Sequence, residues 1–334
     1  MPTQNMKVLV LSPLPEGVVA ALFAEAASKY KLALSFVTVN ELDVGRIKKE
    51  LADTDIVIGD FTFKIPLTAE MCEAMTKVKL IQQPSTGYDH IDIAACKQKG
   101  IPVANIGGAN SISVAEYTIA VALILLKRIA YSHQKLMQGV WAQGELLNVS
   151  TELRGKTWGV IGMGRIGREV GSRAKALGAE VIYYDTARRP PEEEARLGVG
   201  YREFRKLLSE SDAVSIHVPL TKSTEKMMSE REFRLMKPSA VFINPARGEL
   251  TDESALAKAV RDGWIGGAGV DVFSTEPPPP DHPLLLAAKE GTNIILTPHT
   301  AGATSDARMR IIQVTVENVV RVLLGQKPEN VVNQ

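Results

Sequence analysis

The chain has 334 residues, of which 45% are hydrophobic and 23% charged, and its formal net charge is +1. This length exceeds what one hydrophobic core usually holds, so two domains are expected. A nearly neutral chain without long runs of one charge offers no electrostatic footprint for nucleic acid or an anionic membrane, and the composition therefore argues against both as partners.

The N-terminus and the cysteines favour a cytoplasmic protein. The first fifteen residues, MPTQNMKVLVLSPLP, lack the basic and apolar regions of a signal peptide. The longest apolar run, residues 117–126, is too short to span a bilayer and predicts a buried helix. Cys72 and Cys96 lie in no paired pattern, so the sequence predicts neither a disulfide nor a metal site, which fits a reducing cytoplasm.

Short apolar segments alternate with helical ones along the whole chain, which predicts an α/β fold with parallel sheets. In the first third, a helix is expected at 16–29, directly after the first strand. Five strands are predicted in this part of the chain, at 7–12, 33–39, 55–60, 79–84 and 101–106.

A second series of six strands begins at residue 157, and six strands complete a sheet of two mononucleotide-binding halves. Apolar helical segments at 111–128 and 306–325 join this series to the rest of the chain. We therefore expect two Rossmann-like domains. The doubly wound parallel sheet of a dinucleotide-binding domain, 107–299, is inserted into a smaller flavodoxin-like substrate domain, 1–106 plus 300–334. The six strands are 157–162, 180–185, 213–218, 240–245, 267–272 and 293–298.

Residues 160–170, VIGMGRIGREV, carry Gly162, Gly164 and Gly167 in the G-x-G-x-x-G spacing, between a predicted strand and a predicted helix. Gly162 permits a tight turn, Gly164 lets backbone amides approach a pyrophosphate, and Gly167 lets helix and strand pack closely. The helix N-terminus then faces the negative charge. A packing turn without nucleotide is the alternative, but the combination of strand, glycines and helix argues against it.

The next predicted strand ends at Asp185, where an acidic residue binds the ribose 2′-hydroxyl in this kind of fold. A carboxylate repels a 2′-phosphate, so the sequence predicts NAD as the cofactor, with NADP as a weaker alternative. Arg188 and Arg189 follow closely and could reduce this preference.

Side chains suited to catalysis follow the other strands of the same sheet. Ligands of open parallel sheets bind outside the carboxyl ends of the strands, so these side chains are expected on one edge with the glycine loop. Taken singly, each has a structural alternative as a loop charge or a strand-end cap. The residues are His217, Arg247, Asp271, Glu276 and His299.

Three of these side chains fit hydride transfer to a 2-keto acid. Arg247 suits the substrate carboxylate, because a guanidinium binds a carboxylate in bidentate fashion. His299 suits protonation of the forming alkoxide, because histidine changes its charge near pH 7. Glu276, if it contacts His299, would stabilise the protonated imidazole.

At this point the sequence resembles the D-isomer-specific 2-hydroxyacid dehydrogenases over nearly its whole length. The resemblance implies an NAD-dependent oxidoreductase acting on the CH–OH group of its donors, with Arg247, Glu276 and His299 as its catalytic residues. It also implies a homodimer formed through the nucleotide domains. The motifs that carry it are STGYDHID, SISVAEYTIA, LRGKTWGVIGMGRIGREV, IHVPLT, FINPARGELTDESAL, AGVDVFSTEP and LTPHTAG, in the family's order and spacing.

The resemblance further assigns cofactor and substrate contacts. The turn Ser85, Thr86, Gly87 corresponds to the loop whose amides hold the substrate carboxylate, and Lys64 is the cation of the loop DFTFKIP. Asp185 corresponds to the ribose-binding acid and Asp271 to the aspartate facing the nicotinamide carboxamide. The remaining cofactor contacts are Arg165 and Ile166, through their amides to the pyrophosphate, together with His217, Pro219 and Ala246.

Departures from related enzymes bear on the substrate. Formate dehydrogenases carry glutamine where Glu276 stands, which argues against formate. Phosphoglycerate dehydrogenases often continue into a regulatory domain, and they tend to carry an arginine in the loop that spans 60–66 in this chain, where Lys64 is the only cation. The C-terminal segment GQKPENVVN, however, resembles theirs. We therefore expect a 2-keto acid reductase acting on hydroxypyruvate or glyoxylate, with 3-phosphoglycerate as the second choice.

An alternative hypothesis, from a different functional class, is that the chain is an NAD-sensing binding protein and not an enzyme. Corepressors of the C-terminal binding protein type resemble the same family and keep its catalytic residues. No basic or low-complexity segment flanks this chain as a partner-binding tail, so this reading is the least favoured. Turnover of simple keto acids would separate the two.

Overall fold

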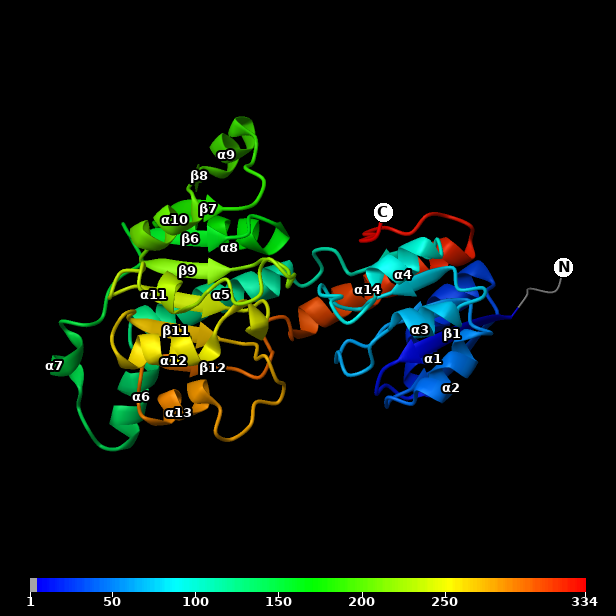
Figure 1. Ribbon diagram of the computed structural model, residues 1–334, viewed down its shortest axis with the longest axis horizontal. Coiled ribbons are helices and arrows are strands. Elements are labelled where there is room, and N and C mark those ends of the chain that lie inside the picture. The colour runs from blue at the N-terminus through cyan, green and yellow to red at the C-terminus, as the bar shows by residue number, and fades with distance from the viewer. Residues whose placement is uncertain (1–4) are drawn as a thin grey trace. The chain divides into compact units, whose positions relative to one another are not determined.

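A computed structural model describes residues 5–334, which form two compact units (Figure 1). The outer unit contains the chain up to Asn110 together with Ser305–Gln334, and the inner unit is Ser111–Thr304. The chain therefore enters the inner unit once and returns to the outer unit for its last helix. The sequence predicts these two boundaries after residues 106 and 299, a few residues before Asn110 and Thr304.

The outer unit is built on a five-stranded parallel sheet with the order β2-β1-β3-β4-β5, which is the flavodoxin-like order. All five strands predicted in the first third of the chain form. Their apolar runs are explained by burial, because helices cover both faces of the sheet. The strands are β1 (Met6–Leu11), β2 (Leu34–Val39), β3 (Ile56–Ile58), β4 (Leu80–Gln82) and β5 (Val103–Ala104).

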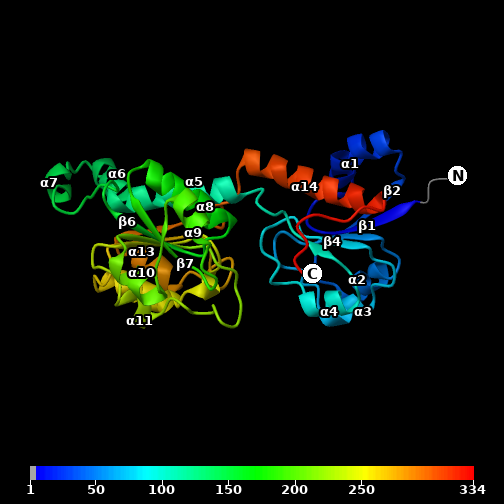
Figure 2. The ribbon, with the colours of Figure 1, turned by 90° about the horizontal axis from the view of Figure 1, so that it is seen from above.

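Five helices cover the two faces of this sheet (Figure 2). Val19, Phe23 and Val319 fill the core under α1 and α14, and Ile47, Met71 and Cys96 fill the core under the other three. The helices are α1 (Glu16–Tyr30), α2 (Val44–Leu51), α3 (Ala69–Glu73), α4 (Ile93–Gln98) and α14 (Ser305–Leu323).

The two cysteines meet inside this core. Cys72 on α3 and Cys96 on α4 are both buried and free, and their Sγ atoms lie 3.4 Å apart. No sequence pattern indicates this proximity, because it depends on how α3 packs against α4.

The inner unit is built on a seven-stranded parallel sheet with the order β12-β11-β10-β9-β6-β7-β8. Strands β6 to β11 have the doubly wound order, β8-β7-β6-β9-β10-β11, and β12 is added beside β11. The α/β fold with two Rossmann-like units is thereby confirmed. The strands are β6 (Thr157–Ile161), β7 (Glu180–Tyr184), β8 (Gly200–Tyr201), β9 (Ala213–Ile216), β10 (Val241–Asn244), β11 (Gly267–Val270) and β12 (Ile294–Leu296).

Six of these seven strands were predicted, and β8 was not. This strand has two residues and pairs only with β7 at the edge of the sheet. A segment so short has no alternation or apolar run by which a strand is recognised in sequence.

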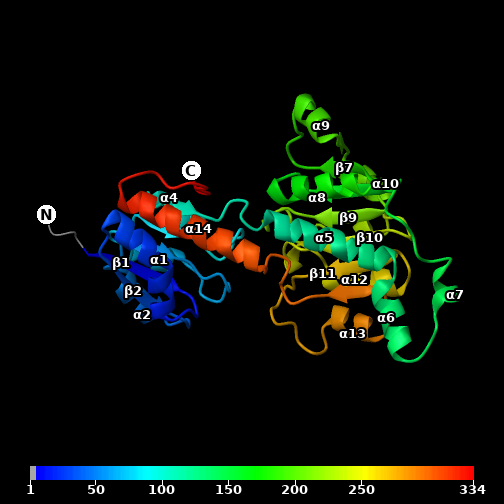
Figure 3. The same ribbon diagram turned by 180° about the vertical axis from the view of Figure 1, so that it is seen from behind.

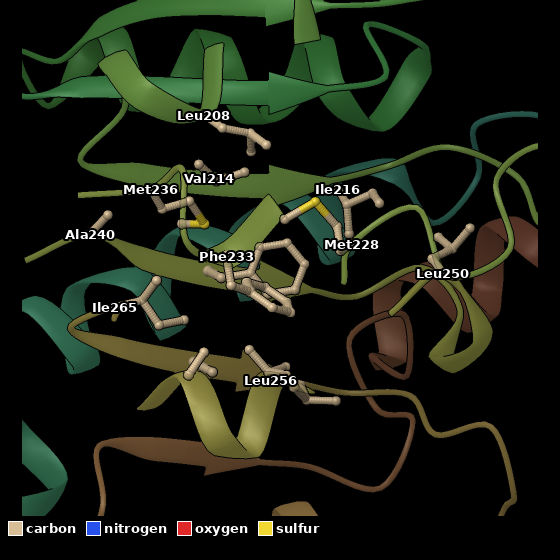
Figure 4. Close-up of a cluster of buried hydrophobic side chains, with 14 of the residues drawn as sticks. Leu208, Val214, Ile216, Met228, Phe233, Met236, Ala240, Leu250, Leu256 and Ile265 are labelled. Atoms are coloured by element: carbon tan, nitrogen blue, oxygen red, sulfur yellow. The ribbon is translucent and has the colours of Figure 1, made fainter. Parts of the chain in front are cut away.

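Helices cover both faces of the inner sheet, with α5 and α8 on one face and α10 to α13 on the other (Figures 2 and 3). Figure 4 shows part of the core between the sheet and α10 to α13, where Phe233, Met228 and Ile216 pack together. The helices are α5 (Ser111–Leu126), α6 (Ile129–Met137), α7 (Gln143–Leu146), α8 (Arg165–Ala176), α9 (Pro191–Leu197), α10 (Phe204–Glu210), α11 (Glu230–Phe233), η1 (Gly248–Leu250), α12 (Glu253–Arg261) and α13 (Pro283–Lys289).

Helices α6 and α7 belong to a segment, 129–149, that extends away from the inner sheet (Figures 1 and 3). We call it the arm. Large apolar side chains are exposed along it: Ile129, Leu136, Met137, Val140, Trp141, Leu147 and Val149. Trp141 and Leu147 are each 77% exposed, which is unusual for side chains of this size.

Neither a membrane span nor a metal cluster is found in residues 5–334. No helix in that range is both long and apolar enough to cross a bilayer. Within the same range, no three histidine, cysteine or acidic side chains gather where they could hold a metal ion.

Candidate active site

One edge of the inner sheet collects the side chains singled out by sequence. Because all seven strands are parallel, their carboxyl ends share this edge. The loops that leave it after β6, β7, β9, β10, β11 and β12 carry, in that order, Gly162, Asp185, His217, Arg247, Asp271 and His299.

The glycine loop has the geometry of an anion cradle. Gly162 has φ +94°, which favours glycine, and a Cβ atom on Gly167 would lie 2.1 Å from the Gly162 carbonyl oxygen. Gly164 is exposed, with open space where its Cβ would stand. It precedes helix α8, whose first amides have no intrahelical acceptor, and as the N-cap residue it has no side chain that could cap them. A pyrophosphate can therefore approach the backbone here.

Asp185 is fixed to this loop. Its Oδ2 accepts hydrogen bonds from the Met163 amide at 3.0 Å and from Nη2 of Arg189 at 2.9 Å. The second oxygen, Oδ1, has the Thr186 hydroxyl at 3.4 Å. The carboxylate thus stands beside the glycine loop with Oδ1 the less engaged oxygen, as binding of a ribose hydroxyl requires.

The two arginines after Asp185 have different partners. Arg188 forms a bidentate pair with Glu194, with both N–O distances 2.9 Å, and Tyr183 donates to the same carboxylate. The hydrogen bonds from Arg188 and Tyr183 lower the pKa of Glu194 to about 2. Arg189 instead forms an ion pair with Asp185. Of the two, Arg189 is therefore the residue whose charge bears directly on the ribose site.

His217 has an enclosed ring. Its Nε2 lies 2.9 Å from the Ser215 hydroxyl, which accepts a hydrogen bond from the Trp158 indole. Nδ1 is buried and has no hydrogen-bonding partner within residues 5–334. Burial lowers the pKa of His217 to about 3, so the ring is neutral near pH 7 and carries no imidazolium proton to donate.

His299 and Glu276 form a pair at the sheet edge. Nδ1 of His299 lies 2.8 Å from Oε2 of Glu276, and both side chains are partly exposed. The other carboxylate oxygen of Glu276 accepts the Phe273 amide at 3.0 Å. Burial by itself would raise the pKa of Glu276, but the bonds from His299 and Phe273 and the positive charges of His299 and Arg247 outweigh it and lower the pKa.

Arg247 reaches the same region from the loop after β10. Its backbone is extended, and its carbonyl oxygen accepts from the side-chain Nδ2 of Asn244 at 2.7 Å. The next residue, Gly248, packs so closely that a Cβ atom there would lie 2.1 Å from the carbonyl carbon of Phe273. The loop that carries Arg247 is thus pressed against the segment that leads to Glu276.

The Asp271 carboxylate is engaged by the loop that carries His299. This carboxylate is fully buried. Its Oδ1 accepts hydrogen bonds from the Thr297 hydroxyl at 2.5 Å and from the Thr300 amide at 2.8 Å. Its Oδ2 accepts from the Ala301 amide at 2.8 Å. The contact with a nicotinamide carboxamide that the sequence suggested stays a prediction.

Sequence reasoning missed two hydroxyls beside Asp271. Tyr117 on α5 lies 2.6 Å from the Thr297 hydroxyl, and Ser113 on the same helix donates to the Ala301 carbonyl oxygen at 2.9 Å. Both residues stand in the segment SISVAEYTIA, which marked them as part of a motif but gave no partner.

The predicted substrate loop lies in the outer unit. The Ser85 hydroxyl donates to the Gly87 carbonyl oxygen at 2.7 Å, and the Thr86 hydroxyl donates to the Asn110 side chain at 2.8 Å. The backbone amides of Thr86 and Gly87 donate to no acceptor in the described part of the chain. Lys64 is exposed, and its own amide is held by Asp60 at 2.9 Å.

Known proteins share both the sequence and the fold. The family model described as "D-isomer specific 2-hydroxyacid dehydrogenase, NAD binding domain" matches residues 119–301. A glyoxylate reductase of Korarchaeum cryptofilum is 39% identical over 290 residues, which cover 86% of this chain and 85% of the relative.

A D-3-phosphoglycerate dehydrogenase of Archaeoglobus fulgidus is 34% identical over 328 residues, 98% of this chain but 59% of that protein. Among solved structures, the D-lactate dehydrogenase of Aquifex aeolicus complexed with NAD and lactic acid superposes with a TM-score of 0.81 at 34% identity. That match covers 95% of this chain and 96% of the other.

Proposed function

The chain belongs to the D-isomer-specific 2-hydroxyacid dehydrogenases, and we propose that within this family it reduces a small 2-keto acid such as glyoxylate or hydroxypyruvate. It is an oxidoreductase of the CH–OH group, and NAD is the usual cofactor of the family. The observation that carries the proposed site is the 2.8 Å contact between His299 and Glu276, with the charge of Arg247 acting on the same carboxylate.

In the proposed reaction, each of the three side chains has one task. His299 delivers a proton from Nε2 to the substrate oxygen, because Nδ1 faces Glu276. Glu276 remains ionised and stabilises the imidazolium form of His299. Arg247 binds the substrate carboxylate and polarises the adjacent carbonyl.

The glycine loop and its surroundings fit the cofactor. When bound, a reduced nicotinamide supplies the hydride that adds to the keto carbon. We propose that the amides of Gly164, Arg165 and Ile166 bind the pyrophosphate, at the N-terminus of α8. The remaining contacts of the proposed site are Gly162, Gly167, Asp185, His217, Pro219, Ala246 and Asp271.

We propose a preference for NAD over NADP. The carboxylate of Asp185 can accept a ribose 2′-hydroxyl through Oδ1, whereas a 2′-phosphate would meet its negative charge. Arg189 partly neutralises that charge, so NADP stays the weaker alternative rather than being rejected.

For the outer unit, we propose that the turn Ser85, Thr86, Gly87 and the exposed Lys64 bind the acid's carboxylate. Supporting this, the side chains of Ser85 and Thr86 are used to hold the turn, and the amides of Thr86 and Gly87 donate to nothing in the described residues. Backbone amides presented together in a turn bind anions.

We further propose that the protein is a homodimer formed through the inner units, with the arm at the interface. Support comes from the exposed apolar side chains of the arm, Trp141 and Leu147 above all. Trp141→Ser/Leu147→Ser should shift the mass measured by light scattering from dimer to monomer. A monomeric wild-type protein would refute the proposal.

We place the enzyme in the cytoplasm, where the close thiols Cys72 and Cys96 stay reduced.

The test is oxidation of NADH, followed by its absorbance, with glyoxylate, hydroxypyruvate, pyruvate, phenylpyruvate and 3-phosphohydroxypyruvate in turn. We expect the highest kcat/KM with glyoxylate or hydroxypyruvate. Preference for 3-phosphohydroxypyruvate would instead support the second candidate, D-3-phosphoglycerate dehydrogenase, which the relative from Archaeoglobus fulgidus favours. NADH binding without turnover of any acid would point to an NAD-sensing binding protein.

A further inference from the structure

We propose that helix α5 positions the catalytic histidine, with Tyr117 and Ser113 holding the two ends of the loop 297–301 that carries His299. The proposal rests on the proposed role of His299, but the contacts themselves are independent of it. We call residues 297–301 the acid loop.

The acid loop holds His299 in an uncommon backbone conformation. His299 has φ +54°, which only a few per cent of residues other than glycine adopt. Its amide donates to the carbonyl oxygens of Asp271 at 2.7 Å and Thr297 at 3.1 Å. Such a conformation persists when the surrounding structure over-determines it, so contacts on both sides of His299 are needed.

The Asp271 carboxylate supplies part of these contacts. It accepts from Thr297 on one side of His299 and from Thr300 and Ala301 on the other. Asp271 lies on the neighbouring loop after β11, so it fixes the acid loop to the sheet but not to the helix layer above it.

Helix α5 supplies the rest. Thr297 has a single hydroxyl proton, which it gives to Asp271, so the Tyr117 hydroxyl is the donor in the 2.6 Å contact with Thr297. The Ser113 hydroxyl donates to the Ala301 carbonyl oxygen at 2.9 Å. Residues four apart on a helix lie on the same face, so one face of α5 is hydrogen-bonded to the first and last residues of the acid loop.

Helix α5 is itself held rigidly, so these two hydrogen bonds come from a fixed position. It packs against α8 and the strands β10 to β12, and ten of its sixteen residues are buried. Burial also raises the pKa of Tyr117, which keeps its hydroxyl protonated and able to donate. Tyr117 and Ser113 are thus positioning residues that act on His299 through the acid loop.

Amide hydrogen exchange tests the positioning without substrate. In Tyr117→Phe/Ser113→Ala, the amides of Thr300 and Ala301 should exchange roughly tenfold faster or more, because the acid loop that carries them loses both of its hydrogen bonds to α5. The matched control is Tyr201→Phe, which removes a tyrosine hydroxyl that donates to Glu203 elsewhere in the inner unit. Unchanged exchange of Thr300 and Ala301 in the double variant would overturn the proposal.

Kinetics separate positioning from general destabilisation. We expect kcat for the preferred acid to fall roughly tenfold in the double variant, because a small misplacement of the acid is costly, with KM for NADH unchanged. Thr297→Val should behave like the double variant and Thr297→Ser like the wild type, which tests the contact if the double variant folds poorly. Equal losses in Thr297→Ser and Thr297→Val would overturn the role of the hydroxyl.

The two proposals fail in different ways. Faster exchange in the acid loop together with a wild-type protein that reduces none of the acids would overturn the proposed reaction and leave the positioning by α5 intact. Normal wild-type turnover with unaltered exchange and kcat in the variants would overturn the positioning alone.

Discussion

Nδ1 of His299 and Oε2 of Glu276 lie 2.8 Å apart although the two residues come from different loops, after the paired strands β12 and β11. The carboxylate is oriented in advance, because its second oxygen accepts the Phe273 amide. An ionised carboxylate held in this way stabilises a protonated imidazole through Nδ1 and leaves proton donation to Nε2, which is the arrangement that a general acid needs.

Removal of the acid should abolish turnover while sparing cofactor binding. General acid catalysis contributes roughly 10²–10⁴-fold, so we expect kcat of His299→Ala to fall by about that factor. Kinetics with the preferred keto acid and titration of NADH fluorescence measure the two effects separately. Loss of NADH binding in His299→Ala would show that the residue serves the cofactor and not proton transfer.

Glu276→Gln should lower kcat and remove the acid limb that Glu276 gives to the pH profile. A neutral amide stabilises the imidazolium donor less than a carboxylate does, and it has no proton to gain as the pH falls. In the wild type the lowered pKa of Glu276 keeps the carboxylate charged, and therefore effective, until the pH falls below the usual glutamate range. Wild-type kcat with an unchanged acid limb in Glu276→Gln would contradict the pairing.

Cofactor preference should depend on Asp185 and Arg189 together. Asp185→Ser removes the charge that repels a 2′-phosphate and releases the Arg189 guanidinium from its 2.9 Å ion pair. We expect the ratio of kcat/KM for NADPH to that for NADH to rise by about tenfold or more, which corresponds to roughly 1.4 kcal/mol. In Asp185→Ser/Arg189→Ala most of this gain should disappear. An equal ratio in both variants would show that Arg189 does not contribute to NADPH binding.

His217 should make the folded state sensitive to acid. Between its ordinary value of 6.5 and about 3, the unfolded chain binds a proton on this ring that the folded chain does not. The wild-type free energy of unfolding should therefore decrease as the pH falls through this window, by up to about 1.4 kcal/mol per pH unit from this group. Urea unfolding of His217→Gln should show a shallower decrease than the wild type. Parallel curves would mean that the ring is protonated in the folded protein.

The local patterns of the sequence determined much of the fold. The strands of both sheets, except β8, were predicted, because buried parallel strands read as short apolar runs between helical segments. The glycine spacing was equally informative: the turn at Gly162 and the close approach at Gly167 are backbone requirements that only glycine meets. His299, Glu276 and Arg247 could be proposed together because parallel strands bring their carboxyl ends to one edge.

Tertiary packing decided the contacts between residues distant in the chain. The Tyr117 hydroxyl meets Thr297 across 180 positions, and Ser113 meets Ala301 across 188. The sequence predicts no relation between Cys72 and Cys96, whereas the packing of α3 on α4 places their sulfurs 3.4 Å apart. Periodicity reports which face of an element is buried, but not which neighbour covers it or at what register, and hydroxyl and thiol contacts depend on that register to within an ångström or so.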